Sequence, residues 1–300
     1  EIIKAALEYY DPLINYADYD YNKDGYIDSI YFVYTAPVDY KNSESLWWAF
    51  TYEYYTDSYE YYDSVEADYY CFMGYDFFFE MPKSGKYLRL NCETVIHETG
   101  HLLGIPDYYD YDDSIGPSGG LGGGDMMDYN VGDHNPFTKI LLGWVSPYIC
   151  RMSMNIDLRS FASSGDCIMV IPFYEDTIFT EFFLLDYYTP TGLNALEAGW
   201  CGLFSTSGLR IYHVNAVRTT KEVYSILDIF ANDNSTTEHK LLSLVQVSGS
   251  SSIVNGEFAT NNDILSNGYY MLSSWNISTN RKYDINVSKN IDGTLNVRIQ

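Results

Sequence analysis

The stretch NCETVIHETGHLLGIPDYYD, residues 91–110, decides how this 300-residue chain is interpreted. It places His97 and His101 four residues apart and sets Glu98 beside the first of them. On a helix, side chains four residues apart lie on the same face, so both imidazoles can bind one metal ion. Glu98 then lies near that face, where we expect it to act as a general base rather than as a ligand.

The third ligand of such a site has to come from outside this pair. A catalytic zinc ion usually takes three protein ligands and keeps one further position open. No Glu lies between Glu98 and Glu175, which argues against a ligand from a later helix. Gly104 can instead end the helix in the left-handed conformation, and Pro106 prevents its continuation. We therefore expect the chain to turn back and Asp107 to complete the zinc site, in the spacing H-E-x-x-H-x-x-G-x-x-D.

A second feature downstream fits the same interpretation. The stretch GGGDMMDYN, residues 122–130, is a Gly-led turn that carries two methionines. In the metzincin pattern, a Met-containing turn runs beneath the metal. Met127 is our first choice for that methionine and Met126 the second, and core packing is the alternative for either. His134 follows closely and could contact a substrate, but a loop histidine capping the next helix is the favoured interpretation.

Three stretches together resemble the immune inhibitor A family of secreted bacterial metallopeptidases. They are HETGHLLGIPDYYDYDDS at 97–114, GGLGGGDMMDYNVGDHNPFTKILLGWVSP at 119–147 and GLRIYHVNA at 208–216. The resemblance covers most of the chain and is strongest around the zinc segment. It implies a zinc-dependent endopeptidase that is made with a propeptide and secreted. By position it makes His97, His101 and Asp107 the zinc ligands and Glu98 the base. The family often has a Trp before its Met-turn, where this chain has Gly124.

The order of the segments predicts an α+β fold. We expect a metzincin-like zinc metallopeptidase domain over residues 1–150 and a β-sandwich-like all-β domain over residues 151–300. Helices are expected over residues 1–10, 92–103 and 136–144, and a strand over residues 27–35. Short β runs separated by turn signals are expected in the second half, at residues 166–174, 180–188, 207–216, 240–249 and 293–300.

An acidic loop near the start of the chain suggests a second metal ion. The stretch DYNKDGYID, residues 20–28, has the register of a calcium-binding loop, with a glycine that permits the sharp turn. Its oxygen-bearing positions are Asp20, Asn22, Asp24 and Asp28. The twelfth position should be a bidentate carboxylate and is Tyr31, so we do not expect an ordinary helix–loop–helix unit. A structural Ca²⁺ ion is preferred over a merely solvated run of acids.

Composition excludes several classes of partner. The formal net charge is −24, which argues against nucleic acid and anionic membranes, because both require clustered Lys and Arg. No run approaches the roughly 18 apolar residues of a membrane-spanning helix, so membrane insertion is not expected. The five cysteines leave at least one thiol free, and a Cys71–Cys92 disulfide is compatible with the sequence.

The leading hypothesis is a secreted zinc endopeptidase that acts on protein or peptide substrates. An extended substrate is expected to pair with an edge strand within residues 69–80. The alternative is a catalytically idle extracellular binding or adhesion module on the same scaffold. A third hypothesis is a calcium-stabilised structural domain with an idle metal ion. The intact H-E-x-x-H-x-x-G-x-x-D motif favours the first.

Overall fold

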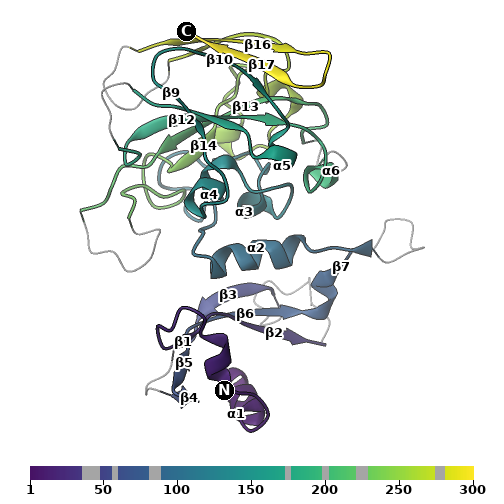
Figure 1. Ribbon diagram of the computed structural model, residues 1–300, viewed down its shortest axis with the longest axis vertical. Coiled ribbons are helices and arrows are strands. Elements are labelled where there is room, and N and C mark those ends of the chain that lie inside the picture. The colour runs from purple at the N-terminus through teal and green to yellow at the C-terminus, as the bar shows by residue number, and fades with distance from the viewer. Residues whose placement is uncertain are drawn as a thin grey trace. The chain divides into compact units, whose positions relative to one another are not determined.

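The computed structural model divides the chain into two compact units, Glu1–Gly104 and Ile105–Gln300. The described residues are 1–35, 48–55, 60–80, 89–172, 177–197, 203–220, 229–273 and 281–300. Both units combine helices with β-sheets (Figure 1), so the chain has the mixed character expected of an α+β protein. The units divide at Gly104, whereas the sequence led us to expect a boundary near residue 150.

A helix and a small sheet form one core of the first unit. Helix α1 (Ile2–Tyr10) agrees with the helix expected over residues 1–10 and buries Leu7. Leu7 packs in one cluster with Tyr16, Ile27, Tyr62 and Val65. The elements around this cluster are the 3₁₀ helix η1 (Tyr16–Tyr19) and the sheet of order β1-β5-β4, made of β1 (Tyr26–Ile27), β5 (Val65–Ala67) and β4 (Tyr61–Tyr62).

The second sheet of this unit supports helix α2 (Glu93–Leu102), as Figure 1 shows. Its strand order is β2-β6-β3, with β2 parallel and β3 antiparallel to the central strand. The buried side chains of Cys71 and Met73 pack against Val95 and Leu102 of the helix. The remaining elements are β2 (Ile30–Tyr34), β3 (Phe50–Glu53), β6 (Tyr69–Gly74), η2 (Tyr75–Phe78) and the pair β7 (Phe79–Glu80) and β8 (Arg89–Leu90).

An edge strand for substrate pairing was expected within residues 69–80. In that range β6 (Tyr69–Gly74) has a hydrogen-bonded strand on each side, so it is not an edge. Strand β7 (Phe79–Glu80) belongs to a two-stranded sheet with β8, and pairing of a substrate within this range stays a prediction. Cys71 and Cys92 are both free thiols, so the disulfide that the sequence would allow between them is not formed.

The second unit is built on two sheets that share one apolar core. Side chains of the five-stranded sheet, such as Phe183 and Ile211, pack in one cluster with Ile285 and Val297 of the four-stranded sheet. The first sheet has the order β14-β13-β12-β11-β9, with β9 (Tyr148–Cys150), β11 (Cys167–Val170), β12 (Glu181–Tyr188), β13 (Gly208–Asn215) and β14 (Leu242–Leu244). The other has the order β10-β17-β16-β15, with β10 (Met154–Leu158), β15 (Gly268–Leu272), β16 (Tyr283–Lys289) and β17 (Leu295–Ile299).

Short helices and a long loop complete this unit, and its described residues do not show a separate all-β domain over 151–300. The loop before residue 136 bonds to later segments of the unit, since Gly120 accepts the N–H of Leu244 and Gly122 accepts that of Ala259. Those bonds explain why residues 105–150 belong to the second unit. The helices are α3 (Met126–Tyr129), α4 (Pro136–Leu141), α5 (Phe161–Ser164), α6 (Asn194–Glu197), η3 (Ile253–Asn255) and η4 (Asn261–Asp263).

The local predictions from the sequence agree with these elements. Each of the five expected β runs contains a strand, and the strand expected over residues 27–35 is divided into β1 and β2. Within the described ranges, no helix combines the length and apolar character needed to cross a bilayer.

A buried ion pair lies in the middle of the five-stranded sheet. Asp186 and Arg210 face each other on β12 and β13, and Nη2 of Arg210 donates to Oδ2 of Asp186 at 2.6 Å. Their side chains are 0% and 1% exposed. The guanidinium also lies over the ring of Tyr188, 4.7 Å from its centroid. Removing one partner would leave the other charge in an apolar core.

We expect Arg210→Met to lower the free energy of unfolding by about 3–5 kcal/mol, because Asp186 then keeps a buried charge without its counter-ion. Urea unfolding at pH 7 measures this change. The double variant Asp186→Leu with Arg210→Met should recover much of the loss, since no buried charge remains. A single variant as stable as the wild type would contradict this account of the pair.

Candidate metal centre

Helix α2 carries the two histidines, and local contacts set both of its ends. The helix begins at Glu93, one residue later than expected, with Cys92 as its N-cap, and Oδ1 of Asn91 accepts the N–H of Glu93 at 2.8 Å. At the other end Gly104 has a φ of +83°, the left-handed conformation that ends helices. Its N–H bonds to the carbonyl of His101 at 2.8 Å. The expected helix and its glycine stop are confirmed.

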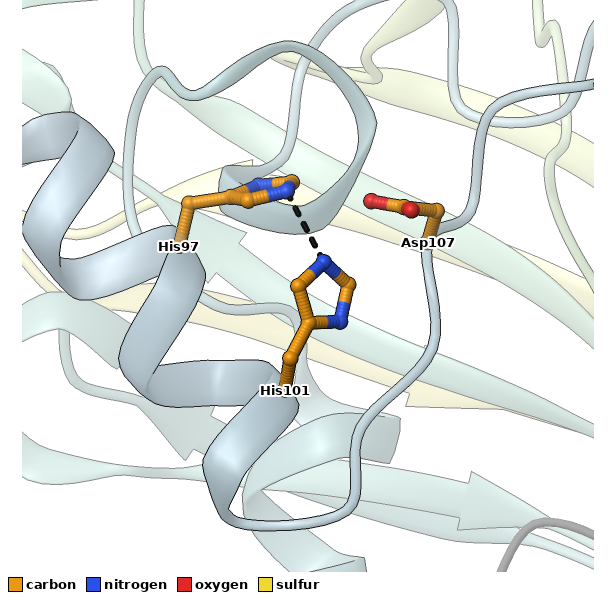
Figure 2. Close-up of side chains that lie close together, drawn as sticks. All are labelled: His97, His101 and Asp107. Carbon is orange, nitrogen blue, oxygen red and sulfur yellow. Dashed lines mark hydrogen bonds between the residues drawn. The ribbon is translucent and has the colours of Figure 1, made fainter. Parts of the chain in front are cut away.

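His97, His101 and Asp107 come together as the sequence predicts. One ligand atom from each residue can be chosen so that all three lie within 4.8 Å of one another. Figure 2 shows both imidazoles rising from the helix and the Asp107 carboxylate pointing toward them from the loop that follows. In the described part of the chain, this is the one group of three or more His, Cys, Asp or Glu residues that could hold a metal ion.

The spacing of the imidazole nitrogens fits zinc. Nε2 of His97 and Nε2 of His101 lie 3.1 Å apart. In a tetrahedral site with Zn–N distances of about 2.0–2.1 Å, two ligand nitrogens lie about 3.3 Å apart. Two nitrogens and a carboxylate oxygen are also a donor set that zinc commonly takes. The three side chains therefore fit a zinc ion, with His97 buried and the other two half-buried.

Glu98 is buried beside His97, and its carboxylate is held by a neighbouring strand. The hydroxyl of Thr51 on β3 lies 2.9 Å from Oε2 of Glu98 and 3.1 Å from its main-chain oxygen, and donates to this pair. Burial, followed by the charge of Glu98, raises the pKa of the nearby Cys71 thiol to about 12. Cys71 therefore remains a protonated thiol.

Asp107 is held by its own loop. The hydroxyl of Tyr111 donates to Oδ2 of Asp107 and also lies 3.1 Å from the hydroxyl of Tyr109. Burial, followed by the hydrogen bonds to Asp107 and Tyr109, raises the pKa of Tyr111, so its proton stays in place as a donor. The N–H of Tyr108 donates to the carbonyl of Met127 at 2.8 Å.

That last bond joins the residue after Asp107 to the expected Met-turn. Met126 and Met127 are both fully buried at the start of α3. Asp125 caps this helix, because its Oδ1 accepts the N–H of Met127 at 2.8 Å. Its Oδ2 accepts the N–H of Asn135 at 2.8 Å, which ties the turn to the start of α4. The assignment of Met127 as the methionine beneath the metal stays a prediction.

We expected His134 to cap the next helix, and this prediction is wrong. Asn135 is the N-cap of α4, and its Oδ1 accepts the N–H of Thr138 at 3.0 Å. His134 is buried, and its ring lies 6.1 Å from that of Trp144. The structure places it in a packed position, and its proposed contact with substrate stays a prediction.

In the acidic loop, carboxylate side chains accept hydrogen bonds from backbone N–H groups of the same loop. Asp20 accepts the N–H groups of Asp24 and Gly25, at 3.1 and 3.0 Å. Oδ2 of Asp28 accepts the N–H of Tyr21 at 3.1 Å, and Nδ2 of Asn22 donates to Asp24 at 2.7 Å. Gly25 has a φ of +93°, which agrees with the sharp turn expected there. Calcium binding by Asp20, Asn22, Asp24 and Asp28 stays a prediction.

Two polar contacts of the site were missed from the sequence. Thr51 lies 47 residues before Glu98 and stands in an aromatic strand without a motif, so no local signal marks it. Tyr111 lies four residues after Asp107 in a segment rich in tyrosine, and that composition hides it.

The chain was compared with known proteins, and neither the protein-family models nor the curated proteins include one that matches it. The functional argument therefore depends on the residues of the site.

Replacing Asp107 by Ala should weaken zinc binding by more than the about 10–100-fold that loss of an outer-shell partner costs, because one of three ligands is removed. A competition titration with a chromophoric chelator measures the dissociation constant. Asp113→Ala is the control, since Asp113 is an exposed acid of the same segment. Unchanged affinity in Asp107→Ala would show that the third ligand lies elsewhere, and Asp110 would be the next candidate.

Asp128, in the same turn, makes the stability of the protein dependent on pH. Its Oδ2 accepts the N–H of Gly123 at 2.6 Å, and burial is the main cause that raises its pKa from 3.8 to about 7. Between pH 4 and pH 7 the folded chain therefore keeps a proton that the unfolded chain has lost. Stability falls as the pH rises through this window and then levels off above it.

We expect Asp128→Asn to stabilise the metal-free protein more at pH 8 than at pH 4.5, because the amide has no proton to lose. The difference between the two pH values is about 3 kcal/mol, at 1.36 kcal/mol for each pH unit between 4.5 and the pKa of about 7. Urea unfolding of both proteins at both pH values measures it, with a chelator present. Parallel stability profiles for the variant and the wild type would contradict the assignment.

Proposed function

We propose that this protein is a secreted zinc-dependent endopeptidase. The observation that carries the proposal is the convergence of His97, His101 and Asp107 beside the buried Glu98. The resemblance of the motif and of the following segments to the immune inhibitor A family supports the same proposal. That resemblance also favours a metzincin-like domain, export from the cell and a structural Ca²⁺ ion in the acidic loop.

The residues of the site divide the chemistry between them. His97, His101 and Asp107 would hold the zinc ion, which when bound acidifies a water molecule and polarises the carbonyl of the scissile peptide. Glu98 accepts a proton from the attacking water and delivers it to the leaving amine. Thr51 orients the carboxylate of Glu98 through the hydroxyl bond to Oε2.

Burial supports the proposed role of Glu98 as the general base. The residue is 5% exposed, so bulk water does not compete for its carboxylate as it would at an open surface. Tyr111 orients Asp107, since a hydrogen bond to one carboxylate oxygen limits the orientations that the carboxylate can take. The site thus combines a ligand set with a fixed base, the arrangement that hydrolysis of a peptide bond needs.

Glu98→Gln should keep zinc affinity and lose proteolysis, because the amide cannot accept the proton. We expect kcat to fall by about 10²–10⁴-fold, the usual contribution of a general acid–base group. Cleavage of casein and gelatin by the propeptide-free chain measures the activity, with zinc content determined on the same samples. A chelator should abolish cleavage by the wild type, and added zinc should restore it.

The assay is run over a range of calcium concentrations, so that an unfilled acidic loop does not hide activity. A zinc-loaded wild type that cuts neither substrate at any calcium concentration would overturn the proposal. The alternative, an idle extracellular binding or adhesion module, would then be favoured.

A further inference from the structure

The loop that carries Asp107 is anchored by residues far along the chain. Nδ2 of Asn234 donates to the carbonyl of Tyr108 at 2.8 Å. The hydroxyl of Ser235 accepts the N–H of Tyr111 at 3.0 Å and donates to the carbonyl of Tyr109 at 3.3 Å. Asn234 and Ser235 are consecutive, and together they bond to the backbone of the three tyrosines that closely follow Asp107.

Asn234 is itself fixed to the five-stranded sheet. Its Oδ1 accepts the N–H of Leu242 at 3.0 Å, and its Nδ2 also donates to the carbonyl of Leu242 at 2.9 Å. The side chain thus bridges β14 and the carbonyl of Tyr108 in a buried position. The fit is close, because a Cβ added at Gly120 would lie 2.8 Å from Nδ2 of Asn234.

A buried ion pair completes the anchor. Nζ of Lys240 donates to Oδ2 of Asp110 at 2.8 Å and to the carbonyl of Asn234 at 2.7 Å. The side chains of Lys240 and Asp110 are 4% and 2% exposed. This pair holds the segment around Asn234 against the loop of Asp107, and it engages the carboxylate that was the alternative third ligand.

These contacts affect the position of Asp107 because its loop lacks regular structure. Residues 105–112 form neither helix nor strand, so their positions depend on bonds to other segments. Tyr108 follows Asp107 directly, and its carbonyl, its N–H and its hydroxyl are bonded to Asn234, Met127 and Thr138. A metal ligand is oriented by the outer groups that hold it.

We propose that Asn234 and Ser235 are positioning residues for Asp107, because they fix the backbone that follows it. The inference rests on the proposed zinc function. The two residues act through the backbone of Tyr108 to Tyr111 and do not touch the metal. The residue that supplies the third ligand is thus placed by a segment more than a hundred positions away, as the separation of 126 between Asn234 and Tyr108 shows.

The test measures zinc affinity in the full chain carrying Asn234→Ala or Ser235→Ala. We expect each variant to bind zinc about 10–100-fold more weakly than the wild type, the usual cost of losing an outer-shell partner. The Co²⁺-loaded variants should also show altered d–d absorption, because the orientation of Asp107 changes. Competition titration and the absorption spectrum need no substrate.

Two matched controls separate positioning from general loss of stability. Asn194→Ala removes a buried side chain that also bridges two backbone groups, the N–H of Asp133 and the carbonyl of Thr189. Ser248→Ala removes a hydroxyl that also makes one donated and one accepted bond. Both should keep zinc affinity within about twofold of the wild type, even where their thermal midpoints fall.

Equal affinities in the test and control variants would overturn the inference. Ser235→Ala removes a single oxygen, so it decides the question even if Asn234→Ala does not fold. If the wild type fails to bind zinc, the proposed function fails. If the wild type binds zinc and Asp107→Ala does not, while Asn234→Ala and Ser235→Ala bind normally, only the positioning role fails.

Discussion

The return of the chain at Gly104 is the constraint on which the candidate site depends. Two histidines on one helix face supply two ligands, and a third residue must approach from another direction. A helix that continued past Leu103 would carry Asp107 away along its axis. The positive φ of Gly104, which other residues adopt only with strain, reverses the chain within three residues and brings the carboxylate toward both imidazoles.

Buried acids recur through this acidic chain, and they are compensated in two ways. Asp186 and Asp110 have the buried cations Arg210 and Lys240 as partners. Asp125 instead accepts bonds from the amides around it, although burial still raises its pKa. Acidic side chains therefore do not all lie on the surface, and those of Asp110 and Asp125 join loop segments to other parts of the same unit.

Local signals account for what could be predicted from the sequence. The spacing of His97 and His101 and the glycine stop identified α2, and short β runs separated by turn signals identified β11, β12 and β13. The third ligand followed from the spacing of one short motif. Contacts between distant segments left no such pattern: Asn234 meets Tyr108 across 126 residues, and Thr51 meets Glu98 across 47. The division at Gly104 was missed for the same reason, because it depends on which strands the loop bonds to.

X-ray absorption at the zinc K-edge, on the chain loaded with one equivalent of zinc, identifies the atoms that bind the metal. We expect nitrogen and oxygen neighbours at about 2.0–2.2 Å, with the more distant scattering of two imidazoles. Sulfur at about 2.3 Å, or scattering from a single imidazole, would contradict the assignment of His97, His101 and Asp107 as the ligands.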